Sequence, residues 1–330
     1  NWTNVSNNNI TSMSSSVGIY LSASHHNTIM DNIINASGSG TVLSMNTGTY
    51  NNVTNVNISA AAGIGISFGN GGSNNVFYNV SVKALGSNAI SVSGSGISTN
   101  NNSFNLMNIN GSKAGILLGS TTGASNMSFN NTQIVSGSAY EDLNMSDTIG
   151  YGTVNFTNCT FNTSKVLVTT NEVFNNFWDV DAYVNSSTGS ALNNVNVSVY
   201  NNTGQLISTS QTNSSGYISR QIIQEYTQNA TASYNMTPHN FTGNLSGYNF
   251  NSANWTISGN YLAGTNPVFL TLTATGGGTD NPPTMSLNSP IDTYNSTLQS
   301  VTFNCTGADD INLTNATLYG NFSGSWIDNQ

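Results

Sequence analysis

The feature that most constrains this chain is a repeat of about 24 residues that fills its N-terminal half. Apolar anchors recur at intervals of 24 to 27 residues: Ile10, Ile34, Ile58, Val82, Ile109, Ile134 and Phe161. A second apolar residue stands five places before each anchor: Val5, Ile29, Val53, Phe77, Phe104, Phe129 and Phe156. Such a period, built from short apolar segments and Asn/Gly/Ser turns, is typical of a parallel β-solenoid. We therefore predict seven rungs, stacked at about 4.8 Å.

Two further columns support the same register. A second apolar segment follows each anchor, commonly after a Gly, at Ile19, Leu43, Ile66, Ile90, Ile116 and Leu143. Three places before each anchor, five of seven residues are Asn: Asn7, Asp31, Asn55, Asn79, Leu106, Asn131 and Asn158. Stacked rungs would place these amides one above another, so we expect an Asn ladder bonded from rung to rung. No segment has helical apolar spacing, and we expect almost no helix.

The repeats carry a family resemblance. Segments such as NNVFYNVSV (74–82) and NNSFNLMNI (101–109), each near a G-x-x-I strand, resemble right-handed parallel β-helix proteins of the pectate-lyase-like and NosD-like type. The resemblance covers roughly half the chain and implies a right-handed parallel β-helix over residues 1–175. It implies little about activity, because that fold hosts lyases, hydrolases, adhesins and stalks alike.

The repeat ends after Phe161, and a different β pattern follows over residues 176–275. We predict strands near 178–184, 194–200, 205–211, 216–223, 229–236 and 267–274, with turns at NNTG (201–204) and NSSG (213–216). The segment 187–218 is similar to the carboxypeptidase-regulatory-like sandwich, an Ig-like module of surface proteins. The fold class expected for the chain is therefore all-β: a solenoid followed by Ig-like β-sandwich domains.

A linker and a short final segment follow. GGGTDNPP (276–283) combines glycines and prolines, which predicts a hinge. Residues 284–330 resemble the start of another Ig-like repeat, but a whole sandwich needs around 100 residues. We expect this partial domain to be completed by residues beyond the chain or by strands of a neighbouring subunit. The start at Asn1, without Met, indicates a processed or partial chain.

The composition excludes several classes of function. Charged residues make up 5% of the chain, only four are Lys or Arg, and the formal net charge is -9. A protein with so few basic residues cannot neutralise phosphates, so we expect no nucleic-acid partner. No apolar run of about 18 residues occurs, so we expect no direct membrane insertion by this segment.

The solubility of such a chain must come from uncharged groups, and its Asn-x-Ser/Thr triplets suggest which ones. There are 29 of these sequons, whereas the reversed triplet occurs about 20 times. Outward alternation of polar residues explains part of the number, but the directional surplus favours N-linked glycans as a covalent modification. The acceptors we predict lie in turns or beside the inward columns: Asn35, Asn79, Asn110, Asn126, Asn144, Asn162, Asn185, Asn213, Asn229, Asn244, Asn295, Asn312 and Asn321. Sequons imply an extracellular or cell-surface location.

Metal and cysteine chemistry have little support. We expect no metal site or cofactor; the candidate Ca²⁺ ligands are Asp179 with Asp181 and Asp309 with Asp310, and no D-x-D-x-D-G loop surrounds them. Glu141, Asp142 and Asp147 could bind Ca²⁺ or act as a carboxylate pair, but a solvated loop explains them better. His25, His26 and Met30 invite a copper interpretation, but adjacent strand residues face opposite ways, and a turn is the simpler explanation. Cys159 and Cys305 are not expected to pair with each other, and Cys159 is expected to be a small buried apolar residue of the solenoid. Cys305 falls on an inward alternation with Val301 and Phe303, and a partner for it could lie in the missing part of that domain.

No nucleophile elbow, phosphate loop or zinc spacing is present, so we expect no enzyme. The function that fits is a structural subunit of an extracellular filament or cell-surface layer (S-layer), assembled by self-association. The resemblance is to prokaryotic cell-surface glycoproteins, with the sequon density favouring archaea. Two alternatives stay open. A carbohydrate-binding adhesin or fibre would need an exposed aromatic row, and a polysaccharide lyase or hydrolase would need converging carboxylates.

Overall fold

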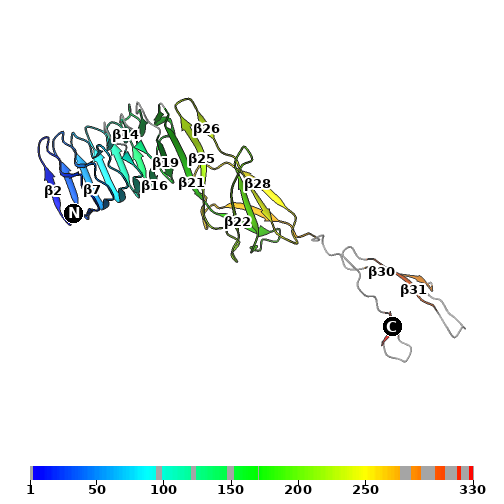
Figure 1. Ribbon diagram of the computed structural model, residues 1–330. Coiled ribbons are helices and arrows are strands. Elements are labelled where there is room, and N and C mark those ends of the chain that lie inside the picture. Colours follow the sequence, from blue (N-terminus) through cyan, green and yellow to red (C-terminus); the bar gives the residue numbers. More distant parts are fainter. Residues whose placement is uncertain are drawn as a thin grey trace.

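The computed structural model describes residues 3–93, 99–119, 124–146, 152–169, 171–275, 284–290, 302–308, 318–320 and 327–329. In these residues the protein is all-β, with a single short 3-10 helix, η1 (Thr163–Lys165). A β-solenoid of about seven turns occupies the N-terminal half (Figure 1). A second β unit follows it along the chain.

Each turn of the solenoid contributes to two sheets. The larger sheet has two arms that meet at a corner. Its first arm runs, in spatial order, through β1 (Asn4–Ser6), β4 (Thr28–Met30), β7 (Asn52–Ala60), β9 (Val76–Ala84), β12 (Ser103–Asn105), β16 (Met127–Asn130), β19 (Thr153–Thr157) and β21 (Val173–Val180). Its second arm contains β2 (Asn9–Ser12), β5 (Ile33–Ala36), the ends of β7 and β9, β13 (Asn108–Gly111) and β17 (Gln133–Val135).

The second sheet of the solenoid, here called the back sheet, has seven strands. They are β3 (Ile19–Ser22), β6 (Leu43–Asn46), β8 (Ile66–Phe68), β10 (Ile90–Val92), β14 (Ile116–Leu118), β18 (Leu143–Met145) and β20 (Val166–Val168). A small pair, β11 (Thr99–Asn100) and β15 (Ala124–Ser125), joins two successive rungs, and each strand falls along the chain between a back-sheet strand and a first-arm strand. All of these pairings are parallel.

The register agrees with the sequence columns residue by residue. Ile10 pairs with Ile34, Ile34 with Ile58, Ile58 with Val82, and the series continues through Ile109 to Ile134. The back-sheet series from Ile19 to Leu143 is equally continuous. The predicted rung alignment is therefore confirmed. Glycine precedes back-sheet strands because a Cβ on Gly65, for example, would lie 2.6 Å from the Ala89 carbonyl oxygen of the next rung.

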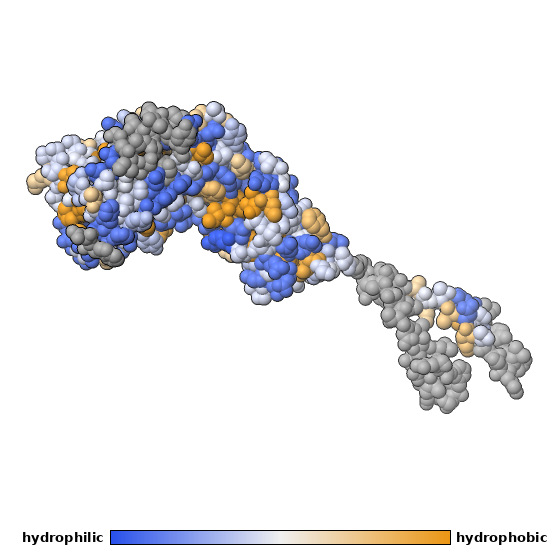
Figure 2. Space-filling model, in the orientation of Figure 1, coloured by the Kyte–Doolittle hydropathy of each residue, from blue (hydrophilic) through white to orange (hydrophobic). Residues whose placement is uncertain are grey.

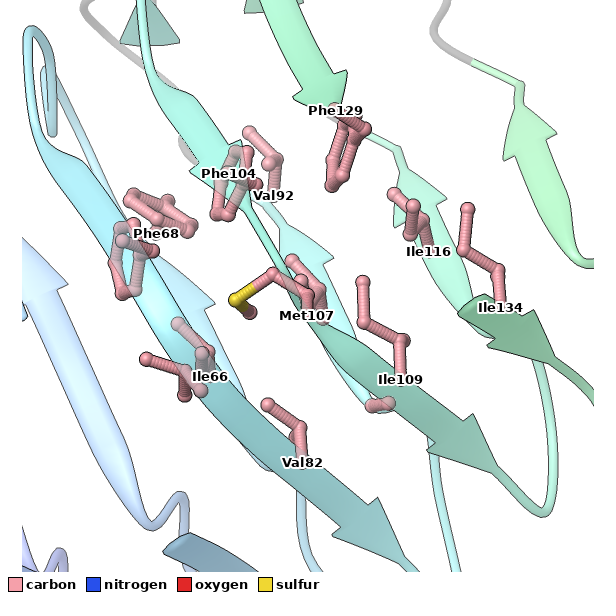
Figure 3. Close-up of a cluster of buried hydrophobic side chains, with 14 of the residues drawn as sticks. Ile66, Phe68, Val82, Val92, Phe104, Met107, Ile109, Ile116, Phe129 and Ile134 are labelled. Atoms are coloured by element: carbon pink, nitrogen blue, oxygen red, sulfur yellow. The ribbon is translucent and has the colours of Figure 1, made fainter. Parts of the chain in front are cut away.

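The inward columns stack into one continuous apolar core. The ring centroid of Phe104 lies 4.8 Å from that of Phe77 and 4.4 Å from that of Phe129, and the rings are nearly parallel. Phe156 and Phe174 continue the stack edge to face. Figure 3 shows how isoleucines such as Ile66, Ile109 and Ile134 fill the space beside these rings. Offset and T-shaped ring contacts of this kind stabilise the stack by about 1 kcal/mol each beyond area burial.

The corner between the two arms explains the recurrent Asn column. Every residue of that column, from Asn7 to Asn158, has a positive φ between 50° and 57°. Asn adopts this left-handed conformation more readily than other non-glycine residues. A second left-handed column, at the start of the first arm, contains His26, Tyr50, Asn74, Asn101 and Asn126. Eight of the 58 asparagines therefore serve backbone geometry in these two columns.

The end of the solenoid differs from the predicted arrangement. Strand β21 is the last parallel strand of the first arm, and it also pairs antiparallel with β25 (Gln221–Asn229), which pairs with β26 (Ser233–Asn235). We predicted strands near 216–223 and 229–236 as parts of the second unit. Ile218 and Ile223 of the first of these do pack in the core of the second unit. The rest of β25, with β26, instead extends the solenoid sheet and covers its end, with Tyr226 against Phe174. Strand β21 crosses the predicted boundary at residue 175.

The second unit has two layers around its own core. One sheet is antiparallel, in the order β24 (Leu206–Gln211), β23 (Asn196–Tyr200), β27 (His239–Asn244) and β28 (Asn251–Trp255). The other is a parallel pair, β22 (Ala182–Ser186) and β29 (Val268–Leu272). Val197, Val199, Phe241 and Leu270 are buried between them. Strands β27 and β28 had not been predicted.

The described part of residues 284–330 contains two hairpins, β30 (Thr284–Ser289) with β31 (Asn304–Ala308), and β32 (Leu318–Gly320) with β33 (Ile327–Asn329). Cys305 and Phe303 were predicted to face inward, but both are exposed. The reason is that no second layer covers β30 and β31 among the described residues. Val301, the third residue of that alternation, lies outside the described residues.

Candidate functional site: glycan acceptors and the carboxylate junction

Ten of the thirteen predicted glycan acceptors lie in the described part of the chain, and none of the ten is buried. Asn295, Asn312 and Asn321 lie outside it. Six acceptors are exposed: Asn79, Asn110, Asn126, Asn162, Asn213 and Asn244. The other four are half-buried: Asn35, Asn144, Asn185 and Asn229. A glycan on any of the exposed six could extend into solvent.

The buried asparagines form a contrasting set, which the sequence reasoning missed. Within the described residues, the buried asparagines are Asn27, Asn32, Asn51, Asn75, Asn102, Asn176 and Asn201. Only Asn201 begins a sequon, although half of all the asparagines in the chain do so. Burial and sequon membership are therefore nearly exclusive in this structure.

Four of these buried residues form an internal ladder at the start of the first arm. The Nδ2 of Asn27 donates to Asn51 Oδ1 at 2.8 Å, Asn51 to Asn75 at 3.0 Å, and Asn75 to Asn102 at 3.0 Å. Each Oδ1 also accepts the backbone N–H of the preceding rung's Asn, at 2.9 Å. Their spacing of 24, 24 and 27 residues repeats the anchor spacing, so the signal was present in the sequence.

The acceptors also differ in what their side-chain nitrogen does, which matters because the glycosyl bond forms at Nδ2. In Asn79 this nitrogen donates to Asn55 Oδ1 at 2.9 Å, and in Asn144 it donates to Glu141 Oε2 at 3.0 Å. For Asn110, Asn126 and Asn244 no side-chain hydrogen bond occurs among the described residues. These last three present a free amide on the surface.

Three acceptors lie in turns that their own side chains stabilise. The Oδ1 atoms of Asn162, Asn213 and Asn229 each accept the backbone N–H two residues later, at 2.9 to 3.0 Å. At Asn162 and Asn229, the hydroxyl of the sequon's third residue also donates to that oxygen, at 2.8 Å. These Asx-turns occupy Oδ1 and leave Nδ2 without a described partner.

The candidate calcium ligands Asp179 and Asp181 have a different partner. The Arg220 guanidinium donates to both oxygens of Asp181, at 3.1 and 3.0 Å, and lies 3.8 Å from Asp179. Hydrogen bonding to Arg220 lowers the pKa of Asp181, although its burial opposes the shift. Asn158 donates to Asp179 at 2.7 Å. Arg220 thus supplies the positive charge at this junction, and Asp309 and Asp310 lie outside the described residues.

The solenoid's own carboxylates are separated and locally bonded. Asp142 is buried and accepts the backbone N–H groups of Ser136, at 2.9 Å, and Asn162, at 2.7 Å. Asp31 accepts from Asn55 in the corner ladder, at 3.0 Å. Asp147 lies outside the described residues. No three His, Cys, Asp or Glu side chains in the described part of the chain converge as metal ligands would.

The histidine and cysteine candidates make packing and hydrogen-bond contacts. His25 Nδ1 contacts Thr49 Oγ1 at 2.5 Å, and His26 stacks on Tyr50 at 5.2 Å. Cys159 is buried and free, as predicted, and burial raises its pKa to about 12, which makes the thiol unreactive. Cys305 is also free.

No protein-family model and no curated protein sequence matches the chain. Within the described residues, no helix has the length and apolar character needed to cross a membrane.

Proposed function

We propose that this protein is a structural subunit of an extracellular filament or cell-surface layer, coated with N-linked glycans and without catalytic activity. The observation that carries the proposal is the sorting of asparagines. Those in the buried ladder lie outside sequons, whereas none of the ten described acceptors is buried and six of them are exposed. Outward alternation contributes to this sorting, but it does not explain why Asn-x-Ser/Thr exceeds the reversed triplet.

The nature of the surface supports the same proposal. Figure 2 shows hydrophilic and near-neutral residues over most of the visible solenoid, with scattered hydrophobic patches. Only 5% of the chain is charged, so this polarity comes mainly from amides and hydroxyls. Glycans on such a surface would add solubility and protection without charge.

The described residues do not favour the two alternatives. The exposed tyrosines of the solenoid, Tyr20, Tyr50, Tyr78 and Tyr140, stand in different columns and form no aligned row in the described part of the chain. Among the same residues, no carboxylate pair of the solenoid faces a shared cleft. An adhesin with a stacked aromatic platform and a polysaccharide-cleaving enzyme therefore have less support than a structural subunit.

The finer classification belongs to the proposal as well. We assign the solenoid as a right-handed parallel β-helix, because its repeats resemble that family. The second unit and the segment around β30 and β31 are assigned as Ig-like for the same reason. Self-association fits the exposed apolar face of the β30–β31 hairpin, where Met285, Leu287 and Phe303 are uncovered. An archaeal cell surface is the setting that the sequon density favours.

Mass spectrometry of natively sourced protein tests the glycan coat. We expect the intact mass to exceed 34.7 kDa by several kilodaltons and to fall to the chain mass after chemical deglycosylation. Peptide mapping should find glycan at Asn110, Asn126 and Asn244, and none at buried Asn51 or Asn75. A native chain with the bare mass would contradict the proposal.

A further inference from the structure

A groove follows the corner of the solenoid, where the two arms meet. Two cavities of about 360 and 660 Å³ lie along it, and Asn79 lines both. The first extends back to Asp31, and the second extends forward to Asn158 and Asn260. The groove therefore runs across successive rungs and ends against the second unit.

One residue of this groove departs from the pattern that builds it. Leu106 occupies the left-handed corner column at φ 54°, where five of the other six residues are Asn. A non-polar side chain in this conformation is uncommon and costs of order 1 kcal/mol or more. Leu106 is also 45% exposed, so burial does not offset that cost. A strained, exposed apolar residue in a cavity indicates a function other than folding.

Leu106 also interrupts the corner ladder. On one side, Asn79 donates to Asn55, and on the other, Asn158 donates to Asn131 Oδ1 at 3.2 Å. The interruption leaves Asn79 Oδ1 and Asn131 Nδ2 without partners among the described residues. This acceptor and this donor stand two rungs apart, or about 10 Å, with the apolar Leu106 side chain between them.

The polar side chains on the opposite wall of the groove also lack hydrogen-bond partners among the described residues. Asn108, Gln133 and Thr160 project from the outward face of the second arm and line the larger cavity. Their side chains make no hydrogen bond to any described residue. The amides on the outer face of the first arm behave differently, since Asn130 donates to Asn105 and Asn175 donates to Asn155, both at 2.9 Å.

We infer that the groove at Leu106 is a binding site for an uncharged oligosaccharide. A sugar ring has an apolar C–H face that suits Leu106, and hydroxyls that can both donate and accept. Asn79 Oδ1, Asn131 Nδ2 and the amides of Asn108 and Gln133 offer the complementary groups. No cationic side chain lines either cavity, so the site lacks the partner that an acidic sugar needs. This inference goes beyond the proposed function. It requires that Asn79, one of the predicted acceptors, carries no glycan, and it does not depend on glycans at the other acceptors.

Two sources could supply such a ligand: the glycan of a neighbouring copy or a free neutral polysaccharide. The probes are therefore the oligosaccharide released from native protein, and neutral cellohexaose, maltohexaose and mannohexaose, with tetragalacturonate as the acidic control. Binding is measured by NMR on the side-chain amides of the full 330-residue chain. We expect at least one uncharged probe to shift Asn108 and Gln133, and tetragalacturonate to leave them unchanged.

The variant Leu106→Asn separates binding from folding. It restores Asn at the left-handed position and lets residue 106 bond to Asn79 and Asn131, so we expect the melting temperature to rise by roughly 2–4 °C. The same change removes the apolar surface and occupies the free amide atoms, so we expect affinity to fall at least tenfold. Val135→Asn replaces another exposed apolar residue, outside both groove cavities, and should bind as the native chain does.

Several results would overturn the inference. One is that no uncharged probe binds at millimolar concentration. Another is that Leu106→Asn binds the uncharged probes as tightly as the native chain does. A third is that the native chain binds tetragalacturonate as tightly as it binds the uncharged probes. A glycan found covalently attached to Asn79 in native protein would also overturn it, because that glycan would fill the groove. A bare native chain would end the proposal of a glycan coat, and the binding test with the three neutral hexasaccharides would stand unaffected.

Discussion

At the scale of single residues, one amino acid serves three physical purposes. Asn takes the left-handed conformation at the solenoid corner, as at Asn55 and Asn131. It links rungs inside the core, as at Asn51. It also presents free amides at the surface, as at Asn110. Position in the rung decides which purpose applies.

The buried ladder gives the first prediction. Asn51→Ala removes the oxygen that accepts from both the side chain and the backbone of Asn27, and it deprives Asn75 Oδ1 of its side-chain donor. Buried polar groups without partners are costly, so we expect a loss of about 2 to 4 kcal/mol in the free energy of unfolding. Asn57→Ala, at an exposed position, should change it by less than about 0.5 kcal/mol. Chemical denaturation measures both, and equal effects would refute the structural role of the ladder.

His239 gives a prediction about pH. It is buried in β27, and burial lowers its pKa to about 4 from an ordinary value of 6.5. Above pH 6.5, neither the folded nor the unfolded state binds the proton, and the stability is fully present. As the pH falls from 6.5 towards 4, the unfolded state binds a proton that the folded state excludes, so stability is lost. Asp181, whose pKa lies below its usual 3.8, adds its own loss only at lower pH.

The measurement compares unfolding at pH 7.5 and pH 4.5. The shift of His239 corresponds to about 2 to 3 kcal/mol lost between these values. His239→Phe removes the titrating group and should reduce that difference by the same amount. A native-like pH dependence in His239→Phe would contradict the assignment.

At the scale of elements, the solenoid register could be predicted from the sequence and its termination could not. The inward columns repeat with such regularity that Ile34, Ile58 and Val82 align from the spacing of the repeats alone, and the strands pair in that same alignment. Alternation in β25 predicts a strand that is buried on one face, but it does not say which sheet the strand joins. The same limit applies to the site: the sequons are readable from the chain, whereas the groove around Leu106 depends on the corner geometry.

The cap formed by β25 and β26 gives a prediction at this scale. Tyr226 covers the end of the aromatic stack, with its ring centroid 5.8 Å from that of Phe174, and its hydroxyl is buried without a described partner. Tyr226→Ala should cost about 3 kcal/mol and increase hydrogen exchange in β19 and β21. Tyr226→Phe should be neutral or stabilising by about 1 kcal/mol, because it removes the unpaired hydroxyl. Equal destabilisation by both variants would contradict this account of the cap.

At the scale of the whole molecule, the protein joins a stacked rod to a two-layer unit through the paired strands β21 and β25. Phe174 and Tyr226 of this pair lie in the solenoid core, and Val180 and Ile223 lie in the core of the second unit. The junction is reinforced by Arg220 with Asp181, and by Glu225, which accepts from Asn176 at 2.7 Å and Trp178 at 2.6 Å. Such continuity suits a subunit that holds a fixed shape within a larger assembly. We propose that this assembly lies outside the cell.

Electron microscopy of natively sourced surface material tests that claim most directly. The account predicts ordered filaments or sheets whose repeating unit accommodates the solenoid and the second unit, with additional density for glycan at exposed acceptors such as Asn110. Monodisperse single chains at high concentration, with no ordered assembly in native material, would contradict it.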